Sequence, residues 1–330
     1  MLLELDADQR LWQETVRDAV GKQCPPSLVR SVAEDGADAS PLWKVYVDAG
    51  WTELTDAENA VELAIVLEEL GRATDPTPFL ATLTQYAPLA GERFDPQLAG
   101  TAVYDGVTAY RDADGWILDG TARHVLDGDR AERIAVVTAA GVFLLDADSV
   151  TTRRSQIFDP VLHVAEVSFA RVHVPDADRL GVDAERARHV ALTGMAVTMV
   201  GACQRILDLA LEHVKSRYQF GVPIGSFQAV QHKAADMHVA IERARALSYF
   251  AALTIAADDP RRRLAAAMAK ASAGECQSLV FRHGLQLFGA MGFTWENDLQ
   301  FALKRAKAGE HMLGGAAEHR AVIAAEYGGF

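Results

Sequence analysis

Residues 216–233 carry side chains suited to a ligand that has both an anionic group and a flat ring. The stretch reads SRYQFGVPIGSFQAVQHK, and two glycines and a proline interrupt otherwise helical sequence. Arg217 offers a fork of N–H donors that matches phosphate oxygens, and Tyr218 and Phe220 can flank a ring. The alternative is an ordinary turn in which Arg217 compensates the negative end of the preceding helix dipole. A second stretch of this kind would favour binding.

Such a second stretch is present at residues 286–297, which read QLFGAMGFTWEN. It combines a glutamine, glycines and aromatic residues at the end of another predicted helix. Two helix ends of this composition in one group of helices favour ligand binding over two ordinary turns.

The elements that must position these stretches fall into three regions. Residues 1–98 have a helical pattern, seen most clearly in VELAIVLEELGRATDP, where apolar residues recur at helical spacing until Gly71 and Pro76 end the helix. Residues 181–330 return to long helices and predict an antiparallel four-helix bundle. Its first helix begins near residue 183, and the later ones are expected at residues 227–257, 261–288 and 298–326.

Between these helical regions, residues 99–180 have the pattern of short strands. IAVVTAAGVFLLDAD (134–148) predicts two strands around an Ala-Gly turn, and HVAEVSFARVHVP (163–175) alternates apolar and polar residues. Short strands with turn signals predict an antiparallel β-sandwich or barrel. The sequence therefore predicts an α+β chain with a helical domain, a β domain and a helical bundle.

Composition excludes several classes of function. The 330 residues are half apolar and carry a formal net charge of −13, which argues against a nucleic-acid partner. The three cysteines lie far apart without metal-ligand spacing, so we expect no metal site. The apolar run at residues 190–211 is interrupted by polar residues and glycines, which indicates a buried core helix and no membrane span. With no signal sequence visible, we expect a cytoplasmic protein.

Together the two stretches resemble motifs of the acyl-CoA dehydrogenase family. Residues 217–221 match R-x-x-F-G, and Phe227–Gln228 follow at the family's distance. Residues 286–296 match Q-x-x-G-x-x-G-F-x-x-E, and EELGR at residues 68–72 and the α–β–α order also agree. The resemblance covers nearly the whole chain, with the first two domains shortened, and it extends to the short subunits of actinobacterial α2β2 enzymes that act on CoA esters of steroid side chains.

The resemblance implies a flavin-dependent oxidation of an acyl-CoA to the 2,3-enoyl-CoA. A glutamate removes the α-proton, hydride leaves the β-carbon for the flavin, and an electron-transfer flavoprotein accepts the electrons. In this family the FAD lies across a subunit interface, so that a neighbouring subunit contacts its adenosine diphosphate end. The resemblance assigns these contacts to Arg217, Gln219, Phe220, Phe227, Gln228, Gln286, Gly289 and Ala290, with Ala290 in place of a glycine.

The half of the site that would hold the chain's own flavin ring departs from the family pattern. His124 and Leu126 stand where the family has a tryptophan and a hydroxyl residue. Alignment of Lys307 with the lysine of the family's R-D-A-K motif places Leu313 at the position of the usual base. A leucine cannot take a proton, so we expect no catalytic residue in this chain. A shift of three residues would instead bring Glu310 to that position.

Three functions follow from this pattern. The first is a subunit that completes the FAD site of a glutamate-bearing partner in an α2β2 enzyme and is inactive alone. The second is an active homo-oligomer that uses Glu310 as its base. The third is a non-enzymatic scaffold that binds flavin or CoA.

Overall fold

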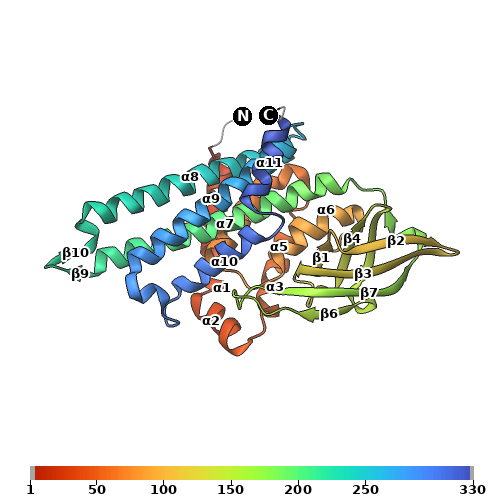
Figure 1. Cartoon of the computed structure of the whole chain (residues 1–330), viewed down its shortest axis with the longest axis horizontal. Helices are drawn as coiled ribbons and strands as arrows, with labels where there is room; N and C mark the ends of the chain where they lie inside the picture. The colour runs from red at the N-terminus through yellow and green to blue at the C-terminus, as the bar shows by residue number, and fades with distance from the viewer. Residues whose placement is uncertain (1–3, 328–330) are drawn as a thin grey trace. The chain divides into compact units, whose positions relative to one another are not determined.

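The computed structural model describes residues 4–327, which divide into two compact units (Figure 1). The helical unit comprises the residues up to Ala37, Ala57–Asp75 and the chain from Leu192 onward; the β unit comprises Asp38–Asp56 and Pro76–Ala191. Along the chain, helices precede Gly100, strands occupy Gly100–Leu180, and helices follow from Ala184. This order confirms the predicted α–β–α fold class, while the boundaries at 98/99 and 180/181 stay predictions.

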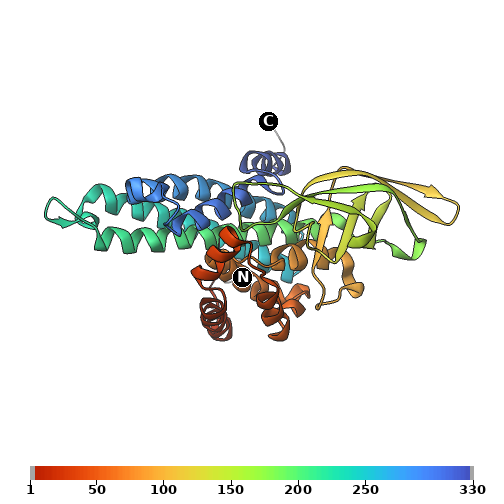
Figure 2. The ribbon, with the colours of Figure 1, turned by 90° about the horizontal axis from the view of Figure 1, so that it is seen from below.

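The helical unit is built from long helices that run alongside one another (Figures 1 and 2). Short loops join α7, α8, α9 and α10, as an antiparallel bundle requires. Its helices are α1 (Ala7–Gln23), α2 (Pro26–Asp35), α4 (Ala60–Ala73), most of α7 (Ala184–Ser216), α8 (Gln228–Ala256), α9 (Arg262–Phe288), α10 (Leu299–His311) and α11 (Ala316–Glu326).

Helix α7 is the apolar helix of the sequence, and 83% of its most apolar window is buried within the protein. Its side chains, with those of α8, α9 and α10, form a core that includes Ile206, Met237, Val280 and Leu303. The prediction of a buried core helix is therefore confirmed.

The EELGR segment joins α4 to α7 and α8 by close packing and buried charge pairs. Gly71 lies against the backbone of Thr198, so closely that any side chain at this position would overlap it. Glu68 is buried and accepts hydrogen bonds from Arg245 Nε at 2.8 Å and from Tyr249 Oη at 3.0 Å. Paired in this way, a buried carboxylate is tolerated and fixes the position of one helix on another.

The β unit contains two four-stranded sheets that share one core. One sheet has the order β1-β4-β5-β8 and the other β2-β3-β7-β6. Val103, Leu118, Phe143 and Val167, two from each sheet, are buried together, as in a sandwich. The strands are β1 (Gly100–Val103), β2 (Val107–Asp112), β3 (Gly115–Leu126), β4 (Arg133–Thr138), β5 (Gly141–Asp146), β6 (Thr151–Arg154), β7 (Val164–Val174) and β8 (Arg179–Leu180).

Short helices complete the β unit. Tyr46 packs against Trp51 with ring centroids 5.0 Å apart and against Phe79 at 5.8 Å. These helical segments are α3 (Ser40–Asp48), α5 (Phe79–Ala81), the π-helical turn η3 (Thr82–Tyr86) and α6 (Ala87–Ala90).

Two details of the prediction are wrong. Strands β1 and β4 pair in parallel, although the predicted sheet was antiparallel throughout. The chain passes through β2 and β3 of the other sheet between them, which supplies the long crossover that a parallel pair needs. The predicted helix at residues 298–326 is two helices, because Leu313 and Gly314 adopt positive φ values of 58° and 93°.

Candidate functional site

The first predicted stretch forms a small β-hairpin at the tip of α7 and α8 (Figures 1 and 2). Strand β9 (Tyr218–Gln219) pairs with β10 (Val222–Pro223) across a two-residue turn. Both turn residues have positive φ, 54° at Phe220 and 80° at Gly221, as a type I′ turn requires. Glycine adopts this conformation readily, whereas phenylalanine rarely does. The turn thus holds Phe220 at the outermost point of the hairpin.

The hairpin presents its aromatic and charged side chains to the outside. Phe220 is 92% exposed, Tyr218 61% and Phe227 39%. Phe220 and Phe227 contact each other edge to face, with centroids 6.2 Å apart. Arg217 is exposed as well, and within residues 4–327 its side chain makes no hydrogen bond or ion pair. Exposed aromatic residues beside an unpaired arginine are typical of a binding surface.

The second predicted stretch follows α9 and ends the same part of the bundle. Gly289, with φ of 60°, stops α9 and starts the 3-10 turn η8 (Gly289–Phe293). Gln286, Gly289 and Ala290 are exposed. The stretch also leaves Phe293 77% exposed and Trp295 48% exposed.

A stacked ring pair brings the two stretches together. His213, one turn before Arg217 on α7, stacks on Phe288 at the end of α9 with centroids 4.5 Å apart and planes 14° apart. Burial, together with the charge of Arg217, lowers the pKa of His213 and favours the neutral imidazole. The structure thus places Arg217 and Gln286 at one end of the helical unit, on adjacent helix termini. Gln219 lies on the hairpin and Gln228 is the first residue of α8, and both are exposed.

Leu313 lies in the loop between α10 and α11. Its φ of 58° is left-handed, and its carbonyl oxygen is 3.0 Å from His319 Nε2. Gly314 and Gly315 follow before α11 begins at Ala316. Leu313 therefore offers an apolar side chain and no proton acceptor at this position.

The carboxylate of Glu310 faces the interior of the helical unit. Its Oε1 accepts a hydrogen bond from the backbone N–H of Ala316 at 3.0 Å, at the start of α11. Its Oε2 is buried without a hydrogen-bond partner among residues 4–327, and Gly274 on α9 leaves room for it. A carboxylate at a helix N-terminus satisfies a free N–H and interacts favourably with the helix dipole. This geometry gives Glu310 a structural task.

Lys270 is a residue of this region that the sequence analysis missed. Its side chain is fully buried on α9, and its Nζ donates to the carbonyl oxygens of Gly314 at 2.7 Å and Glu310 at 3.3 Å. Burial lowers the pKa of its ammonium group to about 8, against the raising effect of Glu310. Lys270 thus fixes the loop that carries Leu313. A lone lysine within the run LAAAMAKASAG was the signal that could have found it.

In the β unit, strand β3 carries the two residues that stand at flavin-ring positions by resemblance. The pairing of β3 with β7 is irregular between Ala122 and Val125, and His124 within this bulge has φ of 58° and an exposed side chain. Leu126 is 2% exposed, so its side chain belongs to the core. Neither position offers a hydroxyl group.

Comparison with known proteins identifies the class. Residues 186–328 match the family model "Acyl-CoA dehydrogenase, C-terminal domain". Acyl-CoA dehydrogenase IpdE2 of Mycolicibacterium smegmatis is 32% identical over 328 residues, which is 94% of this chain and 96% of IpdE2. IpdE2 of Mycobacterium tuberculosis is also 32% identical, over 93% of both chains. The chain belongs to the acyl-CoA dehydrogenase family, whose members are FAD-dependent oxidoreductases that act on CH–CH bonds.

Solved structures agree in fold. A chain of the ChsE4-ChsE5 complex from Mycobacterium tuberculosis superimposes with a TM-score of 0.89 at 24% identity, covering 99% of each chain. A variant of the Tcur3481-Tcur3483 steroid ACAD gives a TM-score of 0.83 at 25% identity, covering 96% of this chain and 97% of the other. Butyryl-CoA dehydrogenase from Megasphaera elsdenii gives 0.90 at 21% identity, covering 99% of this chain and 100% of the other.

Proposed function

We propose that this chain is a subunit of a flavin-dependent acyl-CoA dehydrogenase and completes the FAD site of a glutamate-bearing partner subunit. The observation that carries the proposal is the asymmetry of its site residues. The Arg217 hairpin and the Gln286 helix end match the family's motifs and are exposed, whereas the resemblance puts Leu313 at the position of the base. By itself the chain is inactive.

The residues at the end of the helical unit fit the adenosine diphosphate part of FAD. Arg217 has a guanidinium group without a partner among residues 4–327, available for the pyrophosphate, and Gln228 and Gln286 are exposed and offer amides for polar atoms of the nucleotide. Phe220 and Phe227 supply apolar surface beside them. When bound, the flavin would supply the hydride acceptor, and these residues of the chain would hold its nucleotide end.

The residues at the positions that would contact the flavin ring do not fit that ring as the residues above fit the nucleotide. His124 and Leu126 supply no hydroxyl group, and Leu313 cannot act as a base. Glu310 is the rival base, but one of its oxygens caps α11 and the other is buried. A base has to reach the substrate proton at hydrogen-bond distance. We therefore assign proton abstraction to the partner subunit.

Relatives support an enzyme built from two kinds of chain. ChsE4-ChsE5 is a complex of two proteins, and the Tcur3481-Tcur3483 enzyme, likewise named for two, is a steroid ACAD. By analogy, we assign this chain to an α2β2 enzyme whose substrate is the CoA ester of a steroid side chain. An electron-transfer flavoprotein is the expected acceptor.

The test is dehydrogenation measured with an artificial electron acceptor and acyl-CoA substrates, including a steroid side-chain CoA ester. The chain is assayed alone and after co-purification with the acyl-CoA dehydrogenase-like chain encoded beside it. We expect activity only from the pair, and loss of that activity when the partner's glutamate is changed to glutamine. Turnover by this chain alone would overturn the proposal in favour of the homo-oligomer.

A further inference from the structure

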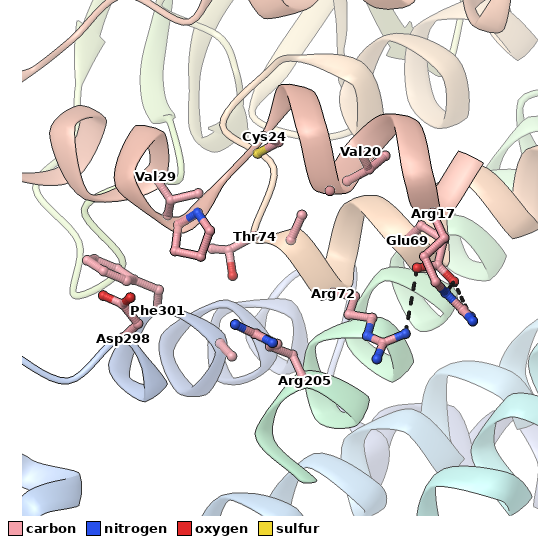
Figure 3. A pocket seen from close by; sticks show the side chains of 14 residues that line it. Arg17, Val20, Cys24, Val29, Glu69, Arg72, Thr74, Arg205, Asp298 and Phe301 are labelled. Carbon is pink, nitrogen blue, oxygen red and sulfur yellow. Dashed lines mark hydrogen bonds and ion pairs between the residues drawn. The ribbon is translucent and has the colours of Figure 1, made fainter. Parts of the chain in front are cut away.

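A pocket of about 270 Å³ lies within the helical unit, between α1, α2, α4, α7 and the start of α10 (Figure 3). Val20, Val29, Phe301 and Ala302 give it apolar walls. Ligand pockets in proteins occupy roughly 300–1,000 Å³, and this one, just below that range, has room only for a small ligand.

Each of the two carboxylates in the lining is paired with an arginine, although Arg30 also pairs with Glu34. Glu69 pairs with Arg17 at 2.7 Å, and Asp298 pairs with Arg30 at 2.6 Å. Arg205 on α7 also lines the pocket, and within residues 4–327 its side chain makes no hydrogen bond or ion pair. Arg72, which also lines the pocket, pairs with Asp208 at 2.5 Å, so Arg205 is the lining arginine without a carboxylate partner among residues 4–327. An anion is the ligand that would compensate its charge.

Thr74 places a hydroxyl group in the same pocket. The residue follows α4 with φ of 60°, a left-handed conformation that is costly for a β-branched side chain. Thr74 is only 3% exposed, yet no hydrogen bond of its hydroxyl is formed with residues 4–327. Figure 3 shows Thr74 entering from the α4 side and Arg205 from the α7 side. The two can serve one ligand head group.

We infer that this pocket binds a small monocarboxylate with an apolar body. The carboxylate accepts hydrogen bonds from Arg205 and Thr74, and the apolar part contacts Val29 and Phe301. A dianion such as phosphate fits less well, because Arg205 is the one lining arginine without a carboxylate partner in the described chain. Its second charge would remain uncompensated, and polar oxygens would meet the apolar walls.

The probe for this inference is hexanoate, with hexanamide and inorganic phosphate as comparison ligands. Isothermal titration is carried out on the purified full-length chain, and on its complex with the partner if the two co-purify. We expect hexanoate to bind measurably and hexanamide and phosphate at least tenfold more weakly. Arg205→Gln should weaken hexanoate binding about tenfold or more, because hydrogen bonds between charged groups contribute on this scale.

Two further variants distinguish a loss of hexanoate binding from a loss of folding. Thr74→Gly should keep the fold, because glycine adopts the left-handed conformation freely, and should weaken hexanoate about three- to tenfold by removing the hydroxyl. Arg10→Gln is the control, since Arg10 is exposed on α1 and does not line the pocket. No binding of hexanoate, equal binding of phosphate, or unchanged binding in Arg205→Gln or Thr74→Gly would each overturn the inference.

Discussion

Replacement of Gly71 by alanine tests the close packing of α4 on α7. In an uncrowded helix, glycine to alanine stabilises by up to about 1 kcal/mol, because alanine has the higher helix propensity. At Gly71 the added Cβ would lie 2.9 Å from the carbonyl carbon of Thr198 and closer still to its oxygen. Carbon atoms in good contact are roughly 3.5–4.0 Å apart, so the helices would have to separate.

The expected sign for Gly71→Ala is therefore the reverse of the helix-propensity effect. Overpacking a core costs typically about 1–3 kcal/mol, and here the obstructing atoms belong to the backbone of a buried helix and cannot rotate away. We expect a net loss of about 2 kcal/mol in the free energy of unfolding. Urea unfolding followed by circular dichroism measures it as a lower transition midpoint.

Gly21 provides a matched control. Like Gly71, it is the third residue from the end of its helix, but a Cβ added there meets no atom within 4 Å. Gly21→Ala should raise the midpoint, by an increment of about 0.5–1 kcal/mol. Equal shifts in the same direction for the two variants would refute the packing argument.

Three further predictions concern the bundle and its loops. Because burial lowers the pKa of Lys270 to about 8, the unfolded chain binds more protons between pH 8 and its unperturbed pKa of 10.5. The free energy of unfolding should thus rise with pH across this window, by up to about 3 kcal/mol relative to the Lys270→Met variant. If the free energy of unfolding depends on pH in the same way in the two proteins, this prediction is wrong. Arg217→Ala should weaken flavin retention in the complex about tenfold, whereas Leu313→Ala should leave turnover largely intact. Equal losses of activity in the two variants would contradict the assignment of Arg217 to the flavin site and of no catalytic role to Leu313. Glu310→Gln should leave turnover unchanged and cost about 1 kcal/mol of stability, whereas collapse of turnover in a stable variant would identify Glu310 as the base.

Much of the fold could be predicted because local signals and tertiary packing agree. The sequence pattern predicts both the Ala-Gly turn between β4 and β5 and the apolar face of α4. The parallel pairing of β1 with β4 is set by two sheets packing together, which no local pattern contains. The break at Leu313 was missed because leucine rarely adopts positive φ, and only its place beside two glycines gave a hint.

The sequence singled out part of the candidate site, and the role of these residues stays a prediction. Arg217 and Gln286 stood out as parts of unusual helix ends, and the stacking of His213 on Phe288 shows how the fold brings those ends together. Lys270 was hidden because its role depends on carbonyl groups 40 and 44 residues away in sequence. Pairwise contacts over such separations follow from the bundle geometry and not from residue periodicity.

The most direct test of the half-site account is the flavin content of the purified protein, measured by visible absorbance. The chain is purified alone and together with the chain encoded beside it. The account predicts little flavin in the chain alone and about one flavin per heterodimer in the pair, because Arg217 and its neighbours hold only the nucleotide end. One flavin per chain in the protein purified alone would contradict it, and Glu310 would then be the first residue to test as the base.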